Sequence, residues 1–107
     1  MKPSQAVDAS MRRPALTDRQ IARMAWRIQR FQRFGLPTHY AEKLADMLAD
    51  RDWQRDDRRI CLECSEYARD GSCLPARQGR MSYASRKWEP VRDVLQRCEH
   101  FSWAMPA

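Results

Sequence analysis

Four cysteines are the residues whose types and spacing point most directly to chemistry. Cys61 and Cys64 have the C-x-x-C spacing of a metal knuckle, Cys73 follows after eight residues, and Cys98 after twenty-four more. Two thiolates at the first spacing can turn their sulfurs toward one ion at about 2.3 Å. Four thiolates complete a tetrahedral zinc ion and leave no position for water or substrate, so we expect a structural rather than a catalytic site.

Zinc is the expected metal, ahead of an iron–sulfur cluster, because the spacing does not match the common ferredoxin runs. No stretch reaches the length of a signal peptide's apolar run or a transmembrane helix, so we expect a cytoplasmic protein. Thiols stay reduced there, which leaves disulfides or free thiols as the third alternative. His100, two residues after Cys98, is an alternative fourth ligand.

The composition indicates one small domain that needs a cross-link. The chain has 107 residues, and its large apolar side chains are thinly spread. Domains of this kind usually recruit a metal, disulfides or a partner. The net charge is +6, and only three of the twenty basic residues are lysine. Arginine preference suits phosphate recognition, although a GC-rich genome produces the same bias.

A first helix is predicted between Thr17 and Gly35. Thr17 and Gln20 fit a capping box, Gly35 suits a left-handed cap, and Pro37 blocks continuation. Ile21, Met24, Ala25, Ile28 and Phe31 share one face of this helix. The opposite face carries Arg19, Arg23, Trp26, Arg27, Arg30 and Arg33. This second face is either a solvated surface or a phosphate-binding face, with Trp26 available to stack on a base or on a partner protein. In a third alternative Trp26 packs on the zinc module or the tail.

A second helix is predicted from Thr38, as N-cap, to about Asp52. Ala41, Leu44, Ala45 and Leu48 give its apolar stripe. Since a short connection joins the two helices, we expect a helical hairpin with both apolar stripes facing inward.

The segment beyond Cys73 is predicted to form a loop and then a third helix. The loop carries Arg77, Arg80, Arg86 and Lys87 around Tyr83, and is either a nucleic-acid contact or an ordinary surface loop. Pro90 is suited to a first helical position. The helix that it begins places Val91, Val94, Leu95 and Cys98 on one face.

The predicted fold is therefore mainly α: a helical hairpin, a four-cysteine metal knuckle and a third short helix. Residues 1–16 are predicted to form a flexible tail, and residues 17–101 a single zinc-stabilised helical domain. Residues 102–107 form an apolar C-terminal tail that either packs back on the helices or docks on a partner.

Two runs of the sequence carry a resemblance to known proteins: Asp56-Asp57-Arg58-Arg59-Ile60-Cys61-Leu62-Glu63-Cys64, and Leu95-Gln96-Arg97-Cys98 with a closing Phe101. They resemble a zinc-finger-like segment in small proteins of proteobacterial plasmids, phages and integrative elements, some of them tied to replication or transfer. The likeness covers about residues 36–101, and its specific part is the cysteines and their neighbours. It implies a DNA-processing context with the four cysteines as metal ligands, and it assigns no role to the arginine helix.

The expected function is that of a non-enzymatic, zinc-stabilised accessory protein that binds nucleic acid through its arginine-rich helix. The alternative is an adaptor or inhibitor that docks on a larger nucleic-acid-processing or defence complex, since arginine and tryptophan dominate protein interfaces. An enzyme is not expected. The sequence has no H-x-E or H-E-x-x-H motif, only the histidines His39 and His100, and three glycines with no phosphate-binding loop.

Overall fold

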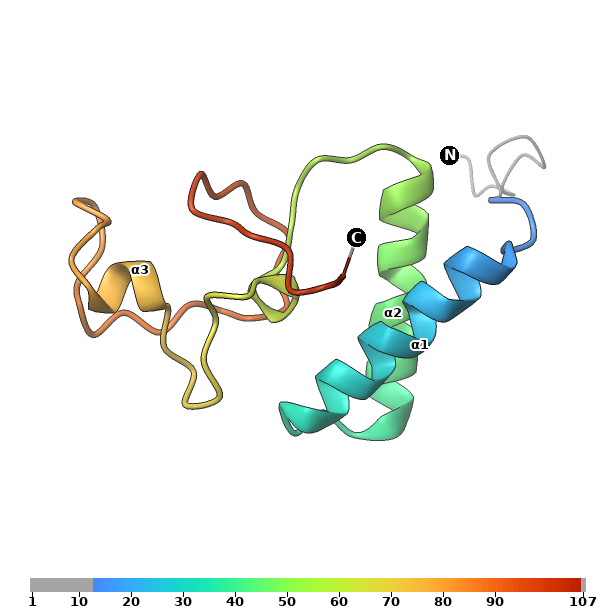
Figure 1. Ribbon diagram of the computed structural model, residues 1–107, viewed down its shortest axis with the longest axis horizontal. Helices are drawn as coiled ribbons and strands as arrows, with labels where there is room; N and C mark the ends of the chain where they lie inside the picture. Colours follow the sequence, from blue (N-terminus) through green and yellow to red (C-terminus); the bar gives the residue numbers. More distant parts are fainter. Residues whose placement is uncertain (1–12, 107) are drawn as a thin grey trace, which may run out of the picture.

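The computed structural model describes residues 13–106 of the chain. It contains helices α1 (Asp18–Arg33) and α2 (Thr38–Trp53), the 3₁₀ turn η2 (Cys61–Glu63) and the one-turn helix α3 (Leu74–Arg77). Within this range the β pairing is limited to isolated bridges. Figure 1 shows α1 and α2 side by side in one half of the molecule, and α3 at the far end of an irregular second half. The predicted mainly α class is confirmed.

Helix α1 begins and ends as its capping residues predict. The backbone N–H of Gln20 donates to Thr17 Oγ1 at 3.2 Å, and the N–H of Thr17 donates to Gln20 Oε1 at 2.8 Å. At the other end Gly35 has a φ of +92°, and the N–H of Leu36 donates to the carbonyl of Phe31 at 3.0 Å. This pair of features is a Schellman cap, which turns the chain toward α2.

The N-cap residue of helix α2 lies one position earlier in the chain than the sequence predicts. Pro37 occupies the N-cap position and Thr38 is the first helical residue. The hydroxyl of Thr38 accepts instead from Gln32 Nε2 of α1 at 2.9 Å. The contact across the hairpin therefore replaces the local cap.

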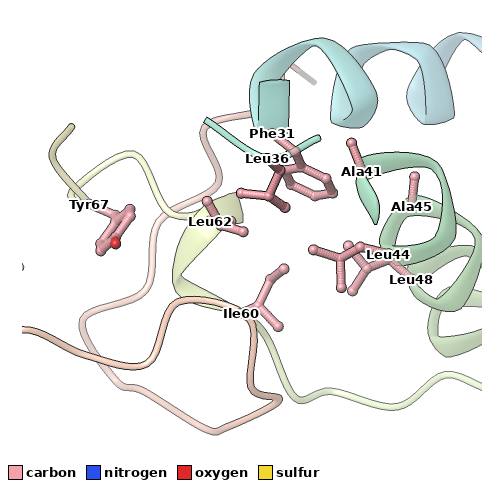
Figure 2. Close-up of a cluster of buried hydrophobic side chains, with 9 residues drawn as sticks. All are labelled: Phe31, Leu36, Ala41, Leu44, Ala45, Leu48, Ile60, Leu62 and Tyr67. Carbon is pink, nitrogen blue, oxygen red and sulfur yellow. The ribbon is translucent and has the colours of Figure 1, made fainter. Parts of the chain in front are cut away.

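One hydrophobic core joins the hairpin to the irregular half (Figure 2). Its buried members are Phe31, Leu36, Ala41, Leu44, Ala45, Leu48, Ile60, Leu62 and Tyr67. Met24 and Ile28 of α1 pack against this core, whereas Ile21 is 53% exposed. The apolar stripe of α2 is buried as predicted, and that of α1 is buried toward its C-terminal end.

The predicted third helix is wrong. Residues 90–98 are not helical, and Val91 and Val94 are 64% and 51% exposed. The backbone of Gln96 exchanges two hydrogen bonds with Arg59, at 2.7 and 2.8 Å, and Leu62 N–H donates to the carbonyl of Arg92. Backbone hydrogen bonds to the segment around Cys61 thus take the place of the intrahelical hydrogen bonds of the helix that was predicted to begin at Pro90.

The ends of the described chain contact its interior. Arg13, in the segment predicted to be a flexible tail, pairs with Asp46 and Asp50 of α2. Residues 1–12 of that predicted tail lie outside the described residues. Of the C-terminal tail, the N–H of Ala104 donates to the carbonyl of Glu63 at 2.9 Å. Among the described residues, no helix is both long and apolar enough to cross a membrane.

Replacing Gly35 with alanine tests the cap between the helices. No atom lies within 4 Å of the position that a Cβ would take, so the cost comes from the positive φ alone. We expect Gly35→Ala to lower the free energy of unfolding by about 1–2 kcal/mol in chemical denaturation. The control Gln29→Ala, on the exposed side of α1, should change it by less than about 0.5 kcal/mol. Equal stability of the two variants would contradict the cap.

Candidate metal centre and arginine surface

The four cysteines line one pocket, together with His100, Tyr67, Trp88 and Phe101 among its other walls. Turn η2 begins at Cys61 and places Cys64 directly after it, where the N–H of Cys64 donates to the carbonyl of Cys61 at 2.9 Å. Cys73 caps α3, and Cys98 comes from the loop that follows Gln96. All four thiols are free and half-buried. The fold therefore brings together donors from three separate segments.

Two of these sulfurs already accept hydrogen bonds. Gln96 Nε2 lies 3.3 Å from Cys61 Sγ, and the backbone N of Glu66 lies 3.4 Å from Cys64 Sγ. Donors of this kind orient ligands that bind a metal. The thiol of Cys73 instead faces Met81 Sδ, at 3.8 Å.

The pKa of the Cys61 thiol is raised to about 12, first by burial and then by the neighbouring Cys64, Cys73 and Cys98. Burial also raises the pKa of Cys73. Thiolates crowded in one half-buried pocket repel each other, and a divalent cation reverses this effect by stabilising the deprotonated form. The donor set thus fits a thiophilic cation such as zinc.

The described residues nevertheless hold no group of three or more Cys, His, Asp or Glu side chains placed closely enough to bind a metal ion as they stand. The pocket collects the four thiols without closing them into a tetrahedron. The metal site remains a prediction, and His100 remains an alternative to Cys98 because both line the pocket.

A buried ion-pair network lies on the inner side of η2. Glu63 is 0% exposed, and its partners Arg27 and Arg51 are 1% and 3% exposed. Arg27 Nε lies 3.0 Å from Glu63 Oε2, and Arg51 Nη1 and Nη2 both donate to the same carboxylate. Asp52 accepts from Arg27 at 2.7 Å and from Arg51 at 2.8 Å. Two positive and two negative side chains thus satisfy each other between α1, α2 and η2.

The pKa of Asp52 reflects these opposing effects. Burial alone raises it, but the hydrogen bonds from Arg51 and Arg27 outweigh burial and hold the pKa below its ordinary value. The carboxylate is therefore charged at neutral pH, as the network requires.

The placement of Arg27 on a phosphate-binding face is wrong. This side chain is buried against Glu63 and Asp52 and is not available to an external phosphate. Glu63 and Arg51 are not among the residues predicted to have a role. The sequence contains one indication of this network, the acidic residue Glu63 inside the C-x-x-C motif. A carboxylate that is buried there needs a buried partner of opposite charge.

The rest of the arginine face divides along α1. Arg19 is exposed and Arg23 half-buried, and both line a groove with Trp103, Met105 and Pro106 of the C-terminal segment. Trp26, half-buried, lies in the middle of the helix, and Arg30 and Arg33 lie in its last turn.

Arg30 connects this end of α1 to the cysteine motif. Its guanidinium donates to the carbonyl of Leu62 and, at 2.8 Å, to that of Cys64. The same guanidinium lies 4.8 Å from the ring centre of Phe34 and 5.7 Å from that of Trp26. Burial lowers the pKa of Arg30, and the nearby charges of Arg33 and Arg69 lower it further.

Half of the basic residues predicted in the loop are neutralised locally. Arg77 pairs with Asp70 at 2.8 Å, and Arg80 pairs with Glu66 at 3.0 Å. Arg86 lies against Gly79, and neither it nor Lys87 has an acidic partner within residues 13–106. All four are exposed.

Comparisons with known proteins identify no relative: no family model matches the chain, and neither a curated protein nor a solved structure matches it significantly. The resemblance to zinc-finger-like segments of mobile elements therefore remains a prediction.

Zinc loading tests the metal centre. We expect one zinc ion per chain by elemental analysis, and unfolding of Cys61→Ser and Cys73→Ser, since zinc supplies about 10 kcal/mol of folding free energy in comparable modules. Chelation of the wild-type protein should abolish its cooperative thermal transition, and added zinc should restore it. The control Ser85→Ala should melt as the wild type does. A Cys61→Ser variant that melts cooperatively near the wild-type temperature would contradict a structural metal.

A single substitution tests the buried network. Glu63→Gln leaves two buried guanidiniums without their shared carboxylate, so we expect it to lower the free energy of unfolding by about 3–5 kcal/mol. The matched control is Glu66→Gln, which removes the half-exposed partner of Arg80 and should cost less than about 1 kcal/mol. Similar losses in both variants would show that burial of Glu63 has no energetic consequence.

Proposed function

We propose that this protein is a non-enzymatic, zinc-stabilised accessory protein that binds nucleic-acid phosphates. The observation that carries the proposal is the convergence of Arg30 and Arg69 on the ring of Phe34, at 4.8 and 5.9 Å from its centre, beside the exposed Arg33. No ion pair joins any of the three to an acid within residues 13–106. A cluster of unneutralised guanidiniums attracts phosphate, which they bind in a bidentate manner.

A structural role for zinc agrees with the environment of the cysteine pocket. Residues 54–106 contain only the short η2 and α3 as helical elements, and the other backbone hydrogen bonds of this half come from turns and isolated bridges. A metal bound by all four thiolates cross-links its segments and leaves no open coordination position for catalysis. A cytoplasmic location and a mobile-element context are part of the same proposal and rest on the sequence.

A protein partner is the second candidate, because apolar side chains are exposed outside the arginine surface. Val91 and Val94 project from the non-helical segment, and Trp53 and Trp103 are both more than one-third exposed. In this case the arginines contact an acidic protein surface rather than a phosphate backbone.

Salt dependence distinguishes the two candidates. Fluorescence anisotropy of labelled oligonucleotides should detect binding at low salt. For two phosphate contacts, at Arg33 and Arg69, we expect the affinity to fall roughly 7-fold for a single strand and 12-fold for a duplex between about 50 and 200 mM salt, because each neutralised phosphate releases a counterion. The absence of binding to any nucleic acid at low salt would contradict the proposal and favour the protein partner.

A further inference from the structure

We propose that the ligand is single-stranded nucleic acid and that it binds a basic–aromatic platform on the C-terminal half of α1, an inference that rests on the proposed nucleic-acid binding. The platform consists of Trp26, Arg30, Arg33, Phe34 and Arg69. Its members come from α1, from the cap that follows it, and from the turn between Cys64 and Cys73. In this arrangement phosphates contact Arg33 and Arg69, and a base stacks on Trp26.

The platform is held in place from beneath. Arg30 is fixed by the carbonyls of Leu62 and Cys64 and lies over Phe34. The ring of Phe34 stacks on Tyr67 with centres 5.5 Å apart, and its carbonyl accepts from Arg92 Nη1 at 2.8 Å. A preorganised surface loses little conformational freedom when a ligand binds to it.

The exposed arginines are either paired with an acid or unpaired, and Arg33 and Arg69 share the unpaired state with Arg19, Arg55 and Arg86 within residues 13–106. Arg58, Arg77, Arg80 and Arg97 each form an ion pair at 3.0 Å or less with a nearby Asp or Glu. Arg33 and Arg69 form none within residues 13–106, although both are exposed. An external anion would therefore reduce the electrostatic repulsion among the guanidiniums of the platform.

Compensation of the helix dipole does not explain the whole cluster. Arg30 and Arg33 lie in the last turn of α1, where cations stabilise any helix. Arg69 belongs to a different segment, and its guanidinium nevertheless lies 5.9 Å from the ring centre of Phe34. Convergence of two segments on one aromatic ring indicates a surface built for a ligand.

The position of the platform favours a single strand over a duplex. Recognition helices of helix-turn-helix proteins contact base edges in the major groove with their N-terminal residues. At that end of α1, Arg19 and Arg23 share a groove with Trp103, Met105 and Pro106, and the basic cluster lies at the opposite end. Aromatic faces beside arginines suit unpaired bases, whose flat surfaces are accessible only when the strands are separate.

The experiment compares two double charge reversals by anisotropy at low salt. The probes are labelled dT15 and rU15 single strands and a DNA hairpin with a 15-base-pair stem. Arg33→Glu with Arg69→Glu alters the platform, and Arg86→Glu with Lys87→Glu makes the same charge change in the loop. We expect the platform variant to lose at least about tenfold in single-strand affinity, and the loop variant less than about threefold. A cooperative thermal melt of each variant serves as the control for correct folding.

A tryptophan pair tests stacking separately from charge. Trp26→Leu should weaken single-strand binding by roughly fivefold or more, because base stacking on an aromatic ring contributes that much per base. Trp53→Leu, at the end of α2 and exposed, is the matched control and should bind as the wild type does. The wild type should bind the single strands at least about tenfold more tightly than the hairpin, and the comparison of dT15 with rU15 assigns DNA or RNA.

Each other outcome overturns a defined part of the inference. Binding of the hairpin as tightly as the single strands rejects the single-strand ligand but leaves nucleic-acid binding standing. A larger loss in the loop variant than in the platform variant moves the site to the loop. An unchanged Trp26→Leu variant rejects stacking, and no binding to any probe rejects the proposed function as well.

Discussion

The rest of this structure depends on the ion pairs of Glu63, whose carboxylate is buried between the guanidiniums of Arg27 and Arg51. This carboxylate is the point where α1, α2 and the cysteine motif meet. An unpaired charge at 0% exposure costs several kcal/mol, so the three elements have to arrive together. The network connects the irregular half to the hairpin, because Arg27 lies on α1, Arg51 on α2 and Glu63 in η2.

The four residues of the C-x-x-C motif divide their roles between two sides of one turn. Cys61 and Cys64 face the cysteine pocket, while Leu62 enters the hydrophobic core and Glu63 enters the ion network. A 3₁₀ turn makes this division possible because successive side chains point in different directions. A metal bound in the pocket would therefore stabilise the same turn whose carbonyls position Arg30.

Burial and neighbouring acids separate the arginines that the core, the paired surface and the proposed platform contain. Arg27 and Arg51 are internal structural residues, and Arg58, Arg77, Arg80 and Arg97 form exposed ion pairs that contribute little to stability. Arg30 binds the carbonyls of Leu62 and Cys64, and the exposed Arg33 and Arg69 beside it have no acidic partner within residues 13–106, which is the basis of the proposed platform. Net charge alone does not separate these groups, because the same residue type occurs in each and only burial and neighbouring acids distinguish them.

The sequence by itself determined the local features: the capping box and Gly35 of α1, the length of both helices, and the apolar stripe of α2. Each depends on contacts between residues at most a few positions apart. It also identified the four cysteines, though not the geometry of their pocket. Only the tertiary structure decided that Arg27 is internal, that residues 90–98 pair with the segment around Cys61 instead of forming a helix, and that Arg69 lies beside Phe34. These outcomes depend on partners 25 to 37 positions away, such as Glu63 for Arg27, and helical periodicity carries no information about such partners.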